Sequence, residues 1–74
     1  MFSFNKIIED LQNGYVLSFI YMEKEHNIMS FDKNRYIVIK YTNDNHNKRE
    51  EKMIVPLKVL KEMWKDMKEI SYVY

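Results

Sequence analysis

The chain has 74 residues, of which 46% are hydrophobic, and it carries twelve Lys and Arg against eleven Asp and Glu. This length gives room for one hydrophobic core, so we expect a single domain over residues 1–74, and a large multi-substrate enzyme is excluded. No cysteine is present, which excludes disulfides and thiolate metal sites. The net charge of +1 is also far below the basic excess typical of nucleic-acid-binding domains.

The start of the chain carries no targeting pattern. It reaches the acidic pair Glu9-Asp10 before any apolar run of signal length, and the longest apolar stretch, 15–22, is interrupted by Ser18. We therefore expect neither a secretion signal nor a membrane contact, and a cytoplasmic location in a bacterial host. The chain lacks alanine and is rich in Lys, Asn, Ile, Tyr and Phe, whose codons are AT-rich, which indicates a bacterial, phage or mobile-element genome.

The first predicted element is a helix at about residues 4–13. Its apolar residues recur at helical spacing and form one stripe, made of Phe4, Ile7, Ile8 and Leu11. Gly14 ends this helix, because glycine readily adopts the left-handed conformation of a helix C-terminus. A strand over 15–22 follows. Both of its faces are apolar, so we expect a central strand, or one covered by a second element or another chain.

The middle of the chain predicts a hairpin. Residues 23–27 are polar and typical of a loop, and residues 27–31 fit either a loop or a strand. A strong strand pattern covers 35–42, with Ile37, Ile39 and Tyr41 on one face. Residues 43–48 contain no apolar side chain and predict the hairpin tip, and a last strand runs over about 49–55.

Pro56 predicts the first turn of a closing helix that continues to about residue 70. Its apolar stripe consists of Leu57, Leu60, Trp64 and Met67, and lysines recur along one flank at Lys58, Lys61, Lys65 and Lys68. The tail 71–74 alternates like a short strand, and its aromatic residues indicate that it is held in place. The fold class is therefore α+β: a helix, a three- or four-stranded antiparallel sheet and a C-terminal helix.

Residues for catalysis or metal binding are scarce. The two histidines, His26 and His46, both lie in predicted polar loops without ligand spacing, so we expect solvated side chains and no metal or other cofactor. No serine sits in a glycine-flanked elbow, and a single glycine excludes a phosphate-binding loop. A small ribonuclease would need a basic groove, which the net charge disfavours. We therefore expect a protein that is not an enzyme.

The candidate partner-binding residues fall into three groups. The lysine row either lies in solvent, with its methylenes over the core edge, or contacts phosphates or an acidic protein surface. Polar residues at the predicted hairpin tip form a modest negative patch, and aromatic residues in the tail are of the type enriched at interfaces. The full set is Asp44, His46, Glu50, Glu51, Lys58, Lys61, Lys65, Lys68, Tyr72 and Tyr74.

The order of helix, Asn13-Gly14-Tyr15 junction, antiparallel strands with a polar hairpin tip and closing helix resembles the small Cas9-inhibiting anti-CRISPR proteins of listerial prophages. The resemblance covers residues 4–70 at the level of architecture. It implies an inhibitor whose acidic surface occupies a DNA-binding site of a nuclease, here through Asp44, Glu50 and Glu51. The slightly basic net charge departs from that pattern.

We therefore expect a small non-enzymatic protein-binding inhibitor, a phage or mobile-element counter-defence protein that blocks a host nuclease or another defence-system protein. Two alternatives stay open. One is a nucleic-acid-binding module that uses the lysine row and neighbouring tyrosines. The other is a homodimer that sequesters a small molecule between its subunits, with strand 15–22 and the tail at the dimer interface.

Overall fold

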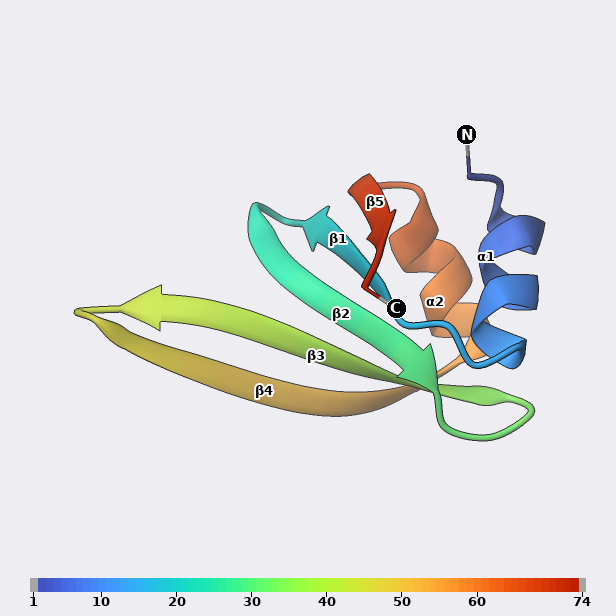
Figure 1. Cartoon of the computed structure of the whole chain (residues 1–74), viewed down its shortest axis with the longest axis horizontal. Coiled ribbons are helices and arrows are strands. Elements are labelled where there is room, and N and C mark those ends of the chain that lie inside the picture. Colours follow the sequence, from blue (N-terminus) through green and yellow to red (C-terminus); the bar gives the residue numbers. More distant parts are fainter. Residues whose placement is uncertain (1, 74) are drawn as a thin grey trace.

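The computed structural model describes residues 2–73, which form a small α+β domain. Its elements in chain order are helix α1 (Phe4–Gln12), strands β1 (Leu17–Tyr21), β2 (Lys24–Ser30), β3 (Arg35–Asp44) and β4 (Asn47–Pro56), helix α2 (Leu57–Trp64) and strand β5 (Lys68–Tyr72). The strands form one antiparallel sheet in the order β4-β3-β2-β1-β5 (Figure 1). The predicted α+β class is confirmed, but the sheet has five strands instead of the predicted three or four. Neither helix is long and apolar enough to cross a membrane.

The end of the chain differs from the prediction, because the last regular element is a strand. Helix α2 ends at Trp64, and after a short turn β5 pairs with β1. The spacing of Trp64, Met67 and Ile70 fits a longer helix equally well. Pairing instead satisfies the backbone groups along the edge of β1, and Met67 and Ile70 still pack against the core. The expectation that the tail is held in place is confirmed for the described residues Ser71 and Tyr72.

A second difference lies at residues 23–27, where the sequence predicts a loop and the structure has a hairpin. Strand β2 begins at Lys24 and pairs with β1 over five residue pairs, from Tyr21↔Lys24 to Leu17↔Ile28. The intervening turn is formed by Met22 and Glu23, whose φ angles are 50° and 64°. Such two-residue turns usually contain Asn, Asp or Gly, because both positions are left-handed. Because Met22 and Glu23 are not residues of this kind, the sequence does not predict the hairpin.

Replacing Glu23 by glycine is expected to stabilise the protein by about 0.5–1 kcal/mol. The left-handed conformation costs an ordinary residue about 1–2 kcal/mol, and the extra entropy that glycine loses on folding offsets part of the gain. Urea unfolding of Glu23→Gly measures the change. Lys24→Gly is the control, since this neighbour lies in regular strand and should lose about 0.5–1 kcal/mol. A midpoint for Glu23→Gly at or below that of the wild type would contradict the prediction.

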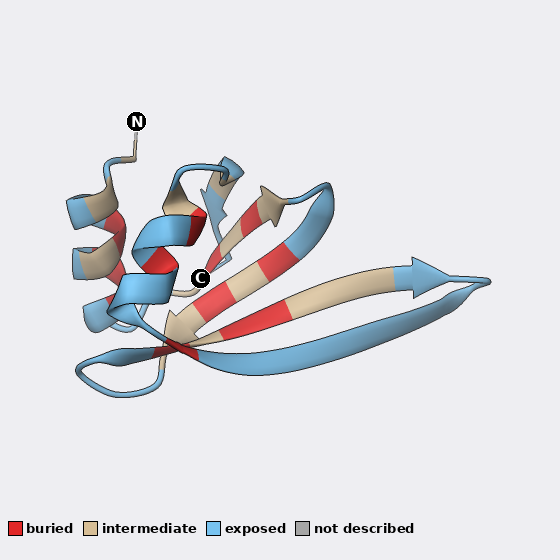
Figure 2. Ribbon diagram, turned by 180° about the vertical axis from the view of Figure 1, so that it is seen from behind, coloured by how far each residue is buried: buried red, intermediate tan, exposed pale blue. Residues whose placement is uncertain are grey.

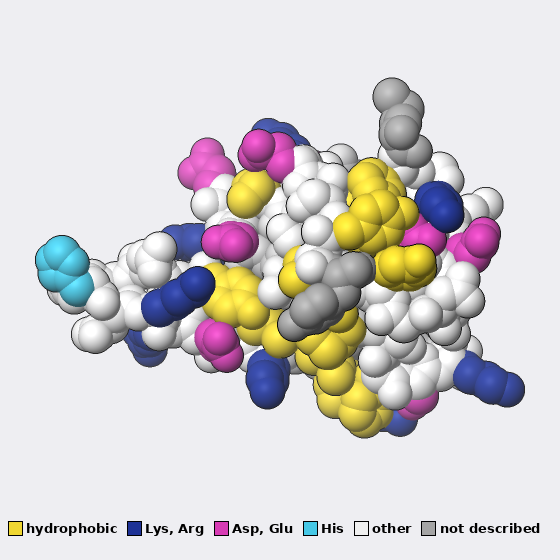
Figure 3. Space-filling model, viewed as in Figure 1, with side chains coloured by type: hydrophobic (Ala, Val, Ile, Leu, Met, Phe, Trp, Pro, Cys, Tyr) yellow, Lys and Arg dark blue, Asp and Glu magenta, His cyan; other side chains and the backbone are white. Residues whose placement is uncertain are grey.

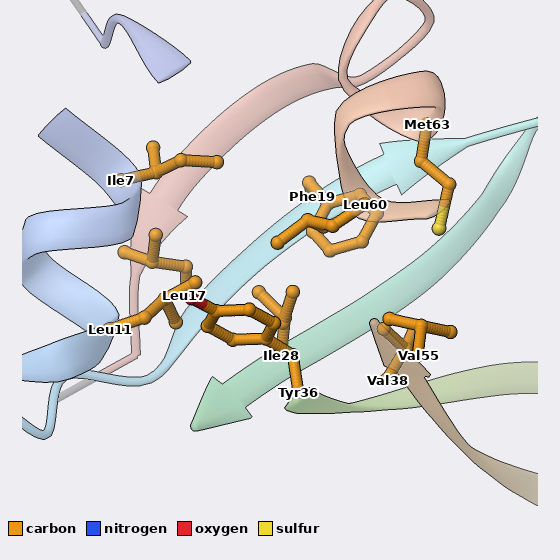
Figure 4. Close-up of a cluster of buried hydrophobic side chains, with 10 residues drawn as sticks. All are labelled: Ile7, Leu11, Leu17, Phe19, Ile28, Tyr36, Val38, Val55, Leu60 and Met63. Carbon is orange, nitrogen blue, oxygen red and sulfur yellow. The ribbon is translucent and has the colours of Figure 1, made fainter. Parts of the chain in front are cut away.

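Both helices pack on the same face of the sheet (Figure 2). The core between these layers is drawn in Figure 4 and consists of Ile7, Leu11, Leu17, Phe19, Ile28, Tyr36, Val38, Val55, Leu60 and Met63. Strands β1 and β3 each contribute two alternate residues, because successive side chains of a strand point to opposite faces. The predicted stripe of α1 and the position of Leu60 in α2 are confirmed, whereas Leu57 is exposed.

Strands β3 and β4 extend beyond the rest of the sheet as a hairpin arm (Figure 1). Each has ten residues against seven in β2, and their pairing continues from Arg35↔Pro56 to Asp44↔Asn47. Asn45 and His46, with φ angles of 48° and 71°, form the two-residue turn at its tip. The strands therefore continue further into the predicted tip than the sequence indicates. Residues from 43 to 54 are all exposed, so the arm is accessible to a partner.

Candidate protein-binding surface

The face of the sheet opposite the helices carries a row of apolar side chains that no described helix or strand covers. In β3, Tyr36 and Val38 point toward the helices, so Ile37, Ile39 and Tyr41 point to the other side. The register places residues of the neighbouring strands beside them, because directly paired residues share a face. This open face comprises Ile20, Met29, Ile37, Tyr41 and Ile54, together with Ile39, which is only 8% exposed.

The open face combines an apolar centre with a charged margin. Ile37 pairs directly with Met29 on one side and with Ile54 on the other, so three apolar side chains lie in line across three strands. Ile54 on the edge strand is 50% exposed. Figure 3 shows apolar side chains gathered over the middle of the sheet, with Lys, Arg, Asp and Glu around them. Such a patch on a small protein is typical of a protein-contact surface.

The polar residues of this face hold its aromatic side chain in place. The Tyr41 hydroxyl accepts a hydrogen bond from the Asn27 side-chain amide over 3.2 Å. The Lys48 ammonium lies 5.0 Å from the centre of the Tyr41 ring, within the range of a cation–π interaction. Tyr41 is thus fixed from both neighbouring strands before any partner arrives. A side chain fixed in advance loses little entropy on binding.

The predicted acidic residues all lie on the arm, but strand alternation divides them between two faces. Glu50 pairs with Tyr41 and so lies on the side of the open face, whereas Glu51 pairs with Lys40 on the side of the helices. Asp44 and His46 are exposed at the tip. The arm therefore does not present Glu50 and Glu51 as one acidic surface.

The predicted lysine row is shorter than the sequence indicates. Lys58 and Lys61 are exposed on α2, and Lys65 is exposed just after its last residue, but Lys68 lies in β5 and is not part of the helix. The Lys65 ammonium is also 3.3 Å from a carboxylate oxygen of Glu62. Two unpaired lysines therefore remain on the helix among the described residues. This is a small footprint for a surface that binds phosphates.

Tyr72 has a structural role that its sequence position does not reveal. Its hydroxyl donates a 2.6 Å hydrogen bond to Asp10, which is only 3% exposed, and the Lys6 ammonium lies 3.0 Å from the other carboxylate oxygen. The rings of Phe2 and Tyr15 lie 5.3 and 5.4 Å from the Tyr72 ring. Tyr72 therefore links β5 to α1, although the residue as a whole remains 47% exposed. The predicted binding residue Tyr74 lies outside the described residues.

The link between Tyr72 and Asp10 shifts the pKa values of both groups. The hydrogen bond from Tyr72, assisted by Lys6, holds the pKa of Asp10 below its ordinary value of 3.8 against the opposing effect of burial. The same hydrogen bond raises the pKa of Tyr72 above 10.0. The ionised carboxylate and the neutral phenol are thus the forms that the folded state favours.

We expect Tyr72→Phe to reduce stability at neutral pH and to have a smaller effect in acid and in alkali. The lowered pKa of Asp10 gives stability that is present above pH 3.8 and lost as pH falls through the folded-state pKa. The raised pKa of Tyr72 gives stability that is present below pH 10.0 and lost as pH rises through its folded-state value. Urea unfolding of both proteins across this range measures the difference. A gap that does not depend on pH would contradict the assignment.

One of the two histidines is not where the sequence places it. His46 is exposed at the arm tip as expected, but His26 lies in β2 and is 4% exposed. Its ring stacks on Phe19 with a centroid distance of 5.3 Å and meets Tyr21 edge-on at 5.6 Å. The prediction of a solvated loop histidine is wrong for His26, because an unrecognised hairpin turns the segment into a strand. Among the described residues no acidic, histidine or cysteine cluster could hold a metal ion.

The burial of two polar residues, Asp10 and His26, was not predicted, although the sequence contains an indication of it in each case. Asp10 lies three positions after Ile7 and one before Leu11, which places a charge on the inner stripe of the first helix. His26 alternates with Ile28, so it points inward once the segment is recognised as a strand. In both cases the signal is a polar residue at a core position of the periodic pattern.

Comparison with protein-family models, curated proteins and solved structures finds no match to this chain. The resemblance to anti-CRISPR proteins therefore stays a prediction. The function has to be inferred from the surface itself, and the open face beside the arm is the part of that surface best suited to contact another protein.

Proposed function

We propose that this protein is a non-enzymatic inhibitor that binds a host or defence-system protein through the open face and the adjoining base of the arm. The observation that carries the proposal is the apolar row across the sheet, where Met29, Ile37 and Ile54 are neighbours on three strands. A row of this kind costs free energy while it faces water, and burial against a partner recovers about 25 cal/mol per Å². The partner is thus a protein with an apolar patch of its own.

The charges around the open face would orient such a partner. Glu25, Glu50 and Lys52 lie on the same side of the sheet, directly beside Ile20, Tyr41 and Ile39 in the register. Mixed charges at an interface margin favour one docking orientation more than they raise affinity. This arrangement supports contact with a protein better than imitation of nucleic acid, which would require one uniformly acidic surface.

The proposal is tested by affinity capture with the tagged protein from host lysate, with a nuclease-treated sample in parallel. We expect one nuclease-resistant partner, identified by mass spectrometry and then purified for titration. Ile54→Glu places a charge in the open face at a half-exposed position of the edge strand. It should weaken binding of that partner at least about tenfold, because the interface would bury the charge without a counter-charge. Thermal unfolding of the variant checks that the fold is retained.

Val59→Glu is the matched control, because Val59 is 42% exposed on α2 and lies on the helix side of the sheet. It makes the same change of charge away from the open face and should bind normally. Equal binding by both variants would reject the open face as the interface. A partner lost on nuclease treatment would instead favour the lysines of α2. A wild-type dimer that Ile54→Glu converts to a monomer would favour self-association.

A further inference from the structure

A hollow of about 390 Å³ lies on the helix side of the sheet, beyond the part that the helices cover. Its lining comes from three strands and the turn after β1, and consists of Tyr21, Met22, Lys24, His26, Lys40 and Met53. The register explains this meeting point, since His26 pairs with Phe19 on one side and with Lys40 on the other. Phe19 belongs to the core, whereas Lys40 is partly exposed, so the hollow lies at the core margin.

The His26 ring lines this hollow, and its two nitrogens differ in their hydrogen-bond partners. Its Nδ1 lies 2.9 Å from the Lys24 carbonyl oxygen, so Nδ1 carries the hydrogen and donates it to that oxygen. Among the described residues Nε2 has no hydrogen-bond partner, yet no buried polar side-chain atom is left unsatisfied. Nε2 must therefore reach solvent, although the residue is only 4% exposed and lines the hollow. In the neutral ring Nε2 accepts a hydrogen bond from an N–H or O–H group.

Two lysines contribute positive charge at the same place. Lys24 lies two residues before His26 on the same strand face, and Lys40 is its direct partner on β3. Neither ammonium forms an ion pair with a described residue, although Glu51 is opposite Lys40 in the register. Tyr21 and Met53 supply the apolar walls, and methionine adapts well to a flat aromatic ring. The hollow is within the size range of small-ligand sites.

From these groups we infer that the hollow binds a small aromatic anion that also carries an O–H or N–H group. The ring packs between Tyr21 and Met53, the anionic group contacts Lys24 and Lys40, and the O–H or N–H donates to Nε2 of His26. Two kinds of molecule share this chemistry, namely hydroxylated aromatic acids and nucleoside monophosphates. The inference goes beyond the proposed protein-binding function and does not depend on it, because the hollow and the open face lie on opposite sides of the sheet.

The test is NMR titration of the isolated full-length protein, observed at the His26 ring and the Met53 methyl group. The probes are 4-hydroxyphenylacetate and uridine monophosphate, and tyramine is the control with the same phenol ring but a positive charge. We expect saturable shifts with at least one anion at millimolar concentration, and at least about fivefold weaker binding of tyramine. The anion whose shifts saturate at the lower concentration identifies the kind of ligand.

Two variants connect the binding to the named groups. Lys40→Gln should weaken binding of the anion about fivefold. Lys58→Gln on α2 removes an equal charge away from the hollow and should leave the affinity unchanged. Phenylacetate lacks the hydroxyl and should bind more weakly than 4-hydroxyphenylacetate. The inference is overturned if neither anion gives saturable shifts up to about 10 mM. It is equally overturned if tyramine binds as well as the anions, or if Lys40→Gln and Lys58→Gln behave alike.

Discussion

Replacing Phe19 by alanine is expected to lower the free energy of unfolding by about 3–5 kcal/mol. Phe19 is 1% exposed in β1, between β2 and β5, and its ring stacks on His26. Truncation would leave a cavity within the core cluster and would also open one side of the buried imidazole. A domain of this size has a total stability of only about 4–11 kcal/mol, so the variant is expected to be close to unfolding at room temperature.

Urea unfolding followed by circular dichroism measures this loss, with Phe31→Ala as the matched control. Phe31 is 47% exposed, and its ring contacts the Arg35 guanidinium at 4.9 Å. The same truncation there should cost less than about 1 kcal/mol, since the side chain is already half in water. If the two variants lost similar amounts, Phe19 could not occupy the centre of the core.

Removal of residues 68–74 is expected to abolish cooperative folding. The deletion takes away β5, including the half-buried Ile70, and leaves the backbone of β1 unpaired along one edge. It also removes the Tyr72 hydroxyl, so that among the residues from 2 to 73 the buried Asp10 carboxylate keeps only Lys6 as a side-chain partner. A small domain has little stability to spare for an exposed strand edge and an incompletely paired buried charge. The truncated protein should show a broad thermal transition and a tendency to aggregate.

The matched control shortens the arm instead of the tail. Deletion of Asn43, Asp44, Asn47 and Lys48 keeps the pair Thr42↔Arg49 beside the Asn45-His46 turn, so the register is preserved. All four deleted residues are exposed, and the core is not involved. This variant should fold cooperatively with a stability close to that of the wild type. A truncated tail that unfolds as cooperatively as the shortened arm would show that β5 is dispensable.

Local patterns in the sequence account for much of this fold. The stripe of Ile7 and Leu11 places α1, and the alternation from 35 to 42 places β3 and also identifies which of its residues share a face. The double-sided apolar character of 15–22 correctly predicts a central strand, since β1 has neighbours on both edges. These elements could be predicted because their signal lies within a few consecutive residues.

The candidate site could be predicted only in part. The apolar face of β3 is visible in the sequence, but its neighbours Met29 and Ile54 are not, because the pairing that brings them together joins separate segments. The hollow is hidden for a similar reason. His26 and Lys40 are fourteen positions apart, and they become neighbours only when the turn at Met22 and Glu23 starts β2 in the observed register.

The sequence by itself determined the α+β class, the first helix, the central strand and the arm, through periodicity and the residues that favour turns. The tertiary structure alone decided how the chain ends and which polar residues are buried. A free strand edge on β1 converts residues 68–72 from a continued helix into β5, and that strand brings Tyr72 to Asp10. Unsatisfied backbone groups and a buried carboxylate are properties of the assembled sheet, so no window of the sequence contains the forces that act on them.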